Sequence, residues 1–305
     1  MNRPKPPEQP VGPSPDSLAG RVFAALYALP PQFESDLRIS GVRATDLFTF
    51  NASLGATIEE QVVDALNALR SATWDQDEQY AQYQFVRQPQ TFPDVVLKAA
   101  APGVTPEIIF GLELKGWYAL AKESEPSFRY RVSPAVCAPG DFLVVFPWAL
   151  SQVISGSPQL FAPYVVSARY AAEYRNWHWT NVIKGGASEG EIRVSTVETN
   201  YPSKAQEISD EAASDRGGNF GRFARTGLMD EYMETLFVED LAGIPVEAWQ
   251  RFLSLFSEQS SAERISRELD RMAHRAAAKR SKVSPRDIER LREHFVEVAE
   301  LLERL

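Results

Sequence analysis

The alternation of apolar and polar residues predicts strands in the first half of the chain, with helices before and after them. Residues whose apolar side chains alternate, or run together over a short stretch, are expected to form strands. The segments that meet this description are 82–88, 92–98, 108–117 and 141–146. Apolar residues that recur every three or four positions predict helices over 17–29, 57–71, 163–183, 228–238 and 246–256. This mixture of strands and helices indicates an α/β protein.

The two ends of the chain differ in composition from its middle. Residues 1–16 contain six prolines and little that could pack, so a disordered tail is expected there. Residues 17–260 are expected to form the main domain. From residue 261 onwards, arginines and lysines fall on an alanine-rich stretch, and Ser284-Pro285 begins another apolar-periodic segment. These features predict a helical hairpin over 261–305, whose basic arm either follows nucleic acid or is the solvated face of a packing or dimerising helix.

Charge and cysteine content narrow the class of protein. A net charge of −9 argues against a non-specific polyanion binder, but it is compatible with a local basic cleft. Cys137 is the single cysteine, which excludes an intramolecular disulfide framework and fits a reducing compartment. No stretch approaches twenty apolar residues, and the N-terminus lacks an apolar signal core. We therefore expect a cytoplasmic protein without a membrane partner.

The strongest candidate chemistry is Pro93-Asp94 followed by Glu113-Leu114-Lys115. A strand over 108–117 would place Glu113 and Lys115 on one face, because side chains alternate along a strand. Asp94 opens the neighbouring apolar run. Two carboxylates and an ammonium are costly in a core unless a divalent cation lies between the carboxylates and the amine faces a phosphate or water. The alternative is a surface hairpin with an incidental Glu–Lys pair, since such triplets also arise by chance.

At these residues the chain resembles the PD-(D/E)XK nuclease superfamily, over about residues 55–150. The resemblance implies a restriction-endonuclease-like core, in which helices flank a mixed central sheet, with added helices at both ends. It also implies that Asp94 and Glu113, with the Leu114 carbonyl, bind Mg²⁺. Lys115 would orient the attacking water, help to deprotonate it, or stabilise the transition state.

Many members of this superfamily add an acidic residue from the helix before the first strand. Glu60 is our choice for that auxiliary role, and the alternative is that this acid belongs to a solvated helix face. The family usually has a helix after the lysine of the motif. Here 117–122 could start one, but 128–132 alternates like a strand, which is a departure from the family pattern.

Two other segments carry candidate DNA contacts. Arg169 and Arg175 lie on the expected helix 163–183, and Asn219, Arg222 and Arg225 lie in the glycine-rich segment 214–227. A glycine-rich turn with arginine forks can approach a phosphate backbone or a guanine edge closely. The alternatives are that the helix arginines only extend their charges to solvent and that the glycines form a flexible turn.

Together these features predict a Mg²⁺-dependent endonuclease acting on double-stranded DNA. A type II restriction endonuclease is the expected role, and palindromic sites would make a homodimer natural. A repair, recombination or phage-defence nuclease of the same superfamily is one alternative. A non-catalytic helical DNA-binding or scaffold protein is the alternative from another class.

Overall fold

A computed structural model describes residues 4–41, 44–88, 91–99, 107–121, 123–183, 191–215 and 217–257, with isolated helical residues beyond that point. Within the helix that begins at Ala44, side chains are described from Gly55 onwards. The C-terminal hairpin that we predicted over 261–305 lies almost entirely outside these residues.

The main sheet of the described chain is mixed and is combined with helices, which is compatible with the predicted α/β class. Its strands are β1 (Tyr83–Arg87), β2 (Val95–Ala99), β3 (Ile108–Tyr118), β4 (Phe142–Leu150), β5 (Pro158–Leu160) and β6 (Tyr164–Ser167). The strand order is β1-β2-β3-β4-β5, and β6 also pairs with β4. The first three strands are antiparallel to one another, β3 and β4 are parallel, and β5 and β6 run antiparallel to β4. All four strands that we predicted are present, with ends shifted by a few residues.

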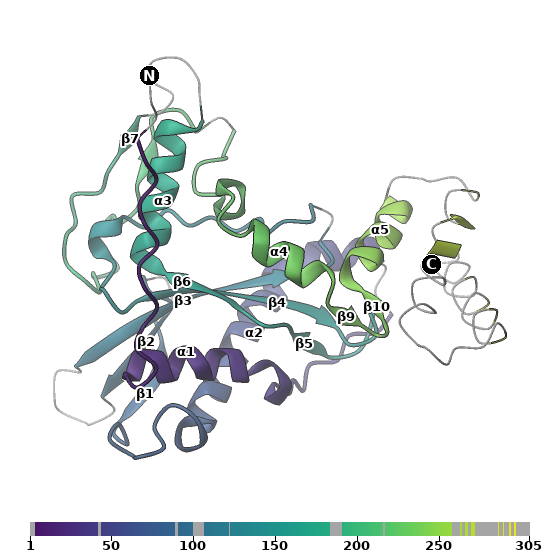
Figure 1. The fold of residues 1–305 in the computed structure, drawn as a ribbon, viewed down its shortest axis with the longest axis horizontal. Helices are drawn as coiled ribbons and strands as arrows, with labels where there is room; N and C mark the ends of the chain where they lie inside the picture. Colours follow the sequence, from purple (N-terminus) through teal and green to yellow (C-terminus); the bar gives the residue numbers. More distant parts are fainter. Residues whose placement is uncertain are drawn as a thin grey trace.

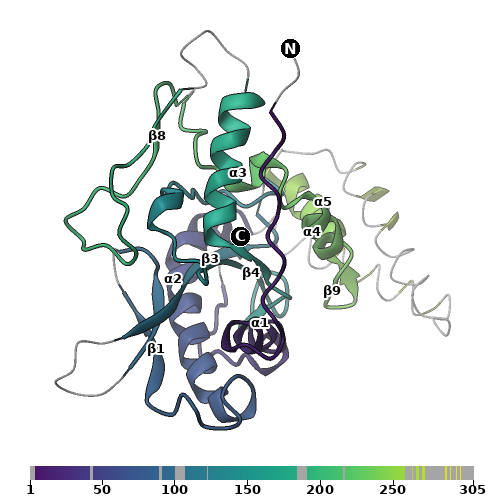
Figure 2. The same cartoon turned by 60° about the vertical axis from the view of Figure 1, so that its left-hand side comes forward.

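Helices cover both faces of this sheet. They are α1 (Leu18–Ala28), α2 (Ala44–Ala68), α3 (Ala168–Asn181), α4 (Asp230–Phe237) and α5 (Val246–Ser257). In Figures 1 and 2, α1 and α2 lie on one side of the sheet and α3 on the other. Helix α2 packs on β1 and β3, and α3 packs on β4 and β6. An edge-to-face chain of rings joins the sheet to α1, because Phe110 contacts Phe142 and Phe142 contacts Phe23.

The predicted helix over 163–183 is wrong at its beginning. Residues 164–167 form β6, whose Val165 and Val166 pair with β4, and the helix starts only at Ala168. The Ser167 side chain accepts a hydrogen bond from the Tyr170 N–H and so caps the helix. β-Branched residues beside a fully buried strand gain more from sheet pairing than from another helical turn.

The connection from β3 to β4 contains no α-helix in its described residues, 119–121 and 123–141. A short 3₁₀ turn, Pro134–Val136, is its regular element. The alternating stretch 128–132 makes isolated bridges to two distant segments, Arg129 to Arg222 and Val132 to Ser209, in place of a full strand. This connection therefore departs from the family pattern.

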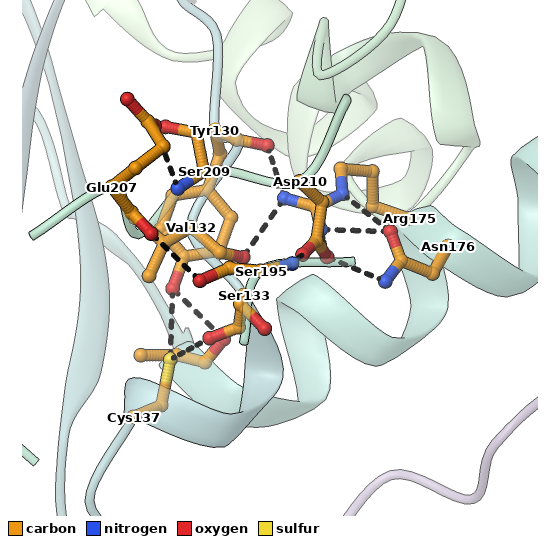
Figure 3. A network of polar contacts seen from close by, with 11 residues as sticks. Tyr130, Val132, Ser133, Cys137, Arg175, Asn176, Ser195, Glu207, Ser209 and Asp210 are labelled. Carbon is orange, nitrogen blue, oxygen red and sulfur yellow. Dashed lines mark hydrogen bonds and ion pairs between the residues drawn. The ribbon is translucent and has the colours of Figure 1, made fainter. Parts of the chain in front are cut away.

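A buried polar network attaches the segment 191–215 to the core (Figure 3). The Arg175 guanidinium donates to the main-chain oxygens of Tyr130 at 2.8 Å and Val132 at 3.0 Å, and to Asp210 Oδ2 at 2.7 Å. The Asp210 Oδ1 atom accepts from the Ser195 N–H at 3.0 Å. The side chains of Arg175 and Asp210 are 2% and 0% exposed. Such a pair is held by several hydrogen bonds because each unpaired charge would be costly in the interior.

The proline-rich N-terminal residues form no helix or strand from residue 4 to residue 13. They run beside α3 in both views (Figures 1 and 2), and the Trp177 Nε1–H donates to the Pro4 carbonyl oxygen at 3.0 Å. Short two-stranded pairs complete the described fold: β7 (Ile192–Arg193) with β8 (Glu211–Ala212), and β9 (Asp240–Leu241) with β10 (Ile244–Pro245).

Candidate active site

The candidate site lies where β2 stops covering the edge of β3. Val95, the first residue of β2, pairs with Leu112, so the edge of β3 beyond Leu112 faces Asp94. The Leu114 N–H donates to Asp94 Oδ2 at 3.1 Å, and the Asp94 N–H donates to Glu113 Oε2 at 3.2 Å. The two parts of the sequence motif are therefore joined by reciprocal hydrogen bonds.

Gly111 allows this approach. A Cβ atom at residue 111 would lie 2.0 Å from Pro93 Cγ, which is closer than any real contact. The absence of a side chain lets the Pro93-Asp94 turn close over β3.

Lys115 completes the cluster, as the alternation along the strand predicts. Its Nζ lies 2.8 Å from Glu113 Oε1 and 3.0 Å from Asp94 Oδ2. The exposed fractions of the side chains are 10% for Glu113, 19% for Lys115 and 34% for Asp94. The structure thus brings the three residues together in a partly buried position that solvent still reaches through Asp94.

The acidic residue of α2 that contacts this edge is Glu59, whereas Glu60, our choice for the auxiliary role, faces Arg87. The Gly116 N–H donates to Glu59 Oε1 at 3.2 Å, whereas Glu60 is 62% exposed and lies 3.6 Å from Arg87. Gly116 packs closely on Gly55, since a Cβ atom there would be 3.1 Å from the Gly55 Cα. Gly55 and Glu59 lie one helical turn apart. The sequence alone does not distinguish the two acids, because Ala56 precedes Glu60 by the same spacing.

Two carboxylates pair with one ammonium at this site, and the Glu59 carboxylate lies close enough to feel the Lys115 charge. Burial raises the pKa of Glu113 to about 7; the Lys115 charge opposes this shift and the Asp94 charge adds to it. Burial by itself would lower the pKa of Lys115, but attraction to Glu113 and Asp94 outweighs it and raises that pKa. Burial also raises the pKa of Glu59, against the attraction of Lys115. The negative charge is under-compensated, so the cluster favours a further cation.

The oxygen atoms of this cluster suit Mg²⁺. Within the described ranges, no three His, Cys, Asp or Glu side chains are gathered as a metal-binding group. Asp94 and Glu113 nevertheless supply two carboxylates. The Leu114 carbonyl points to the same edge of β3 as its N–H, because both groups of an extended residue face one side. Carboxylate and carbonyl oxygens with open positions for water are the ligands that Mg²⁺ prefers.

A cavity of about 270 Å³ opens beside the cluster, which we call the active-site cavity. Its lining includes Glu59 and Lys115 on one side and Ser127 and Phe128 on the other. A ligand in this cavity would meet the Lys115 ammonium and the Glu59 carboxylate, while Asp94 and Glu113 lie behind Lys115, outside the lining.

The candidate DNA-contacting residues fall into two groups, those that make structural contacts and those at the glycine-rich turn. Arg175 does not contact DNA as predicted, because its guanidinium is buried in the network with Asp210. Arg169 uses Nε and Nη2 to hold the Cys137 carbonyl, at 3.2 and 2.6 Å, and so fixes the turn before β4. The remaining candidates, Asn219, Arg222 and Arg225, lie together at the glycine-rich turn, described from residue 217. Whether these three bind DNA stays a prediction.

Comparison with protein-family models, with curated proteins and with solved structures found no match for this chain. In the part of the chain that the structure describes, no helix is long and apolar enough to cross a membrane. What the site can do is therefore decided by the chemistry of its own residues.

Proposed function

We propose that this protein is a Mg²⁺-dependent nuclease that hydrolyses phosphodiester bonds in double-stranded DNA. The observation that carries the proposal is the convergence of Asp94, Glu113 and Lys115 at the uncovered edge of β3, with Lys115 Nζ within 3.0 Å of both carboxylates. A structural ion pair needs only one carboxylate for each ammonium. Burial raises the pKa of Glu113 and the charge of the second carboxylate adds to the shift, so a bound cation would relieve a repulsion that the ion pair alone leaves in place.

Asp94, Glu113 and the Leu114 carbonyl are the groups that would hold Mg²⁺. When bound there, the ion supplies Lewis-acid stabilisation of the phosphate and lowers the pKa of a coordinated water. The reciprocal hydrogen bonds between Asp94 and β3 hold both carboxylates in position before any ligand arrives. Preorganised groups of this kind do not have to be ordered during the reaction.

Lys115 has the role of a hydrogen-bond donor and a fixed positive charge. Its pKa is raised by Glu113 and Asp94, so the ammonium is protonated at neutral pH and is a poor base while both carboxylates face it. In this state it can orient a water or stabilise negative charge on the phosphate. The raised pKa favours these two roles over deprotonation of the water.

The order of elements around the site also supports a restriction-endonuclease-like core. Helix α2 precedes three antiparallel strands, and β4 runs parallel to β3. The missing α-helix in the described connection from β3 to β4 is a difference from the family pattern, and α3 covers that face instead. A type II restriction endonuclease that acts as a homodimer is the particular role that we propose.

The test is cleavage of supercoiled plasmid DNA in Mg²⁺, with Ca²⁺ and EDTA as metal controls. Wild type should cut only with Mg²⁺, and Asp94→Ala should abolish cutting because it removes a metal ligand. Lys115→Ala should lower the rate by about 10²–10³-fold, the usual loss for one donor that stabilises transition-state charge. The control is Asp77→Ala, which removes an exposed carboxylate that pairs with Arg21 and should leave the rate unchanged.

Discrete fragments would support a restriction endonuclease, and a smear would indicate a nuclease without sequence preference. A wild-type protein that leaves plasmid intact in Mg²⁺ would refute the proposed function. Near-normal cleavage by Asp94→Ala would remove Asp94 from the site.

A further inference from the structure

A second cavity, of about 240 Å³, lies between the end of α3 and the glycine-rich turn, and we call it the arginine cavity. Its lining includes His178, Trp179, Ile183, Asn219, Arg222 and Arg225. The volume is just below the ~300–1,000 Å³ that is typical of small-molecule sites, so the cavity suits one small ligand.

The charge of the lining is positive. Arginines 175, 222 and 225 line the cavity, and no acidic residue does so. Arg175 is neutralised by Asp210. Arg222 and Arg225 are instead held by carboxylates outside the lining, Glu123 at 3.4 Å and Glu125 at 2.9 Å. Ion pairs at such an exposed position contribute little stability, so a phosphate can compete for these guanidinium groups.

Two buried hydrogen-bond donors of the lining have no partner among the described residues. They are Nε of Arg222 and Nε1 of Trp179. The Trp179 side chain is 4% exposed, and its ring packs edge-on against Phe220 at 5.2 Å. Buried donors are almost always paired in folded proteins. Two residues with such donors therefore line this cavity, next to the Arg225 guanidinium.

We propose that the arginine cavity binds a single nucleotide, with its phosphate held by Arg222 and Arg225 and its base against the apolar wall of Trp179 and Ile183. Guanidinium groups bind phosphate through two parallel hydrogen bonds, and this geometry suits an arginine pair better than a lone ammonium. An aromatic and aliphatic wall favours the flat face of a base. The nucleotide is either a free nucleoside monophosphate or one unpaired unit of a strand, since both present the same chemistry.

The cavity adjoins the candidate active site through one segment of the chain. Phe128, which lines the active-site cavity, stacks on Phe223 of the glycine-rich turn with ring centroids 6.0 Å apart. Two residues further on, the Tyr130 N–H donates to the Gly221 carbonyl at 2.7 Å. The same segment therefore contacts the linings of both cavities. Nucleotide binding in the arginine cavity uses none of the three residues of the proposed nuclease site. The nucleotide proposal and the nuclease proposal can therefore be refuted independently.

The experiment is calorimetric titration of the full-length protein with dAMP, dGMP, dCMP and dTMP in EDTA. Inorganic phosphate and the four deoxynucleosides are titrated in parallel. Wild type should bind at least one nucleotide more tightly than it binds inorganic phosphate or the corresponding deoxynucleoside. Arg225→Gln should weaken that binding by at least about tenfold, because it removes a charge-assisted hydrogen bond. Glu125→Gln should tighten it, because the competing carboxylate is gone. The matched control is Arg251→Gln, which removes an arginine paired with Glu247 on α5 and should leave the affinity unchanged.

A second titration separates the two sources of nucleotide. It compares a fully paired DNA duplex with the same duplex carrying one unpaired adenine, both in EDTA. Preference for the unpaired base that is lost in Arg225→Gln supports a strand as the source, and binding of free nucleotides alone supports the small molecule. If thermal unfolding shows that Arg225→Gln does not fold, Arg225→Lys is used in its place. This variant keeps the positive charge but loses the bidentate guanidinium, so it should still weaken binding.

The proposal is overturned if wild type binds neither a mononucleotide nor the unpaired base. It is also overturned if inorganic phosphate binds as tightly as the best nucleotide, or if Arg251→Gln weakens binding as much as Arg225→Gln does.

Discussion

The raised pKa of Glu113 predicts that the metal-free protein loses stability as the pH rises. Glu113 has an ordinary pKa of 4.5 and a pKa of about 7 in the folded chain, chiefly because burial disfavours its charged form. Between these two values the folded state holds the proton more tightly than the unfolded state does. The stabilisation is therefore fully present below pH 4.5 and is lost as the pH rises to about 7.

The expected size of this loss follows from the shift. Each pKa unit corresponds to about 1.4 kcal/mol, so Glu113 should lower the free energy of unfolding by about 3 kcal/mol across this range. The conversion applies because the side chain is only 10% exposed. Glu113→Gln removes the titrating group but keeps its shape, so this part of the pH dependence should disappear.

The assay is urea unfolding of wild type and Glu113→Gln in EDTA at pH 5, 6, 7 and 8. The difference between the two proteins is the informative quantity, because burial also raises the pKa of Asp141, to about 6, and Asp141 titrates in both. We expect the variant to gain stability relative to wild type as the pH rises. In saturating Mg²⁺ the difference should shrink, because a bound cation favours the ionised form of Glu113.

Parallel pH dependence of the two proteins in EDTA would refute the reasoning, because it would mean that Glu113 is not held in a cluster that disfavours its charge. A wild type that gains stability relative to the variant at high pH would show that Lys115 outweighs burial. If Mg²⁺ at pH 8 leaves the stability of wild type unchanged, the proposed metal site is refuted, but the raised pKa of Glu113 is not.

Two further predictions concern the neighbouring acids of α2 and the buried Arg175–Asp210 pair. Glu59→Gln should slow cleavage and raise the Mg²⁺ concentration required, because Glu59 faces the site. Glu60→Gln should change neither, since its exposed ion pair contributes under about 1 kcal/mol. Equal effects of the two variants in the plasmid assay would contradict this assignment. Arg175→Met should lower the free energy of unfolding by about 3–5 kcal/mol, because it leaves the buried Asp210 carboxylate without its partner. Replacing Asp210 as well, in Arg175→Met/Asp210→Leu, should recover part of that loss in urea unfolding, and a single-variant loss below about 1 kcal/mol would contradict the role of the network.

The sequence by itself predicted four strands of the main sheet and the meeting of Asp94, Glu113 and Lys115. Strand periodicity is a local property, so the common face of Glu113 and Lys115 follows from their spacing alone. The apolar runs after Asp94 and around Glu113 predict two strands, and the pairing of these strands brings Asp94 to the same place.

Only the tertiary structure decided which residues outside those strands share in the site. Glu59 and Glu60 are adjacent acids on one helix, and the packing of Gly55 against Gly116 rotates the first towards β3 and the second towards Arg87. The ion-pair partner of each arginine could not be predicted from the sequence either. Arg175 is buried because Asp210, far along the chain, lies opposite it, while Arg222 and Arg225 meet exposed acids and stay at the surface. A charged side chain takes its role from the charge that the fold places beside it, and that partner is set by long-range packing, which no local pattern of residues contains.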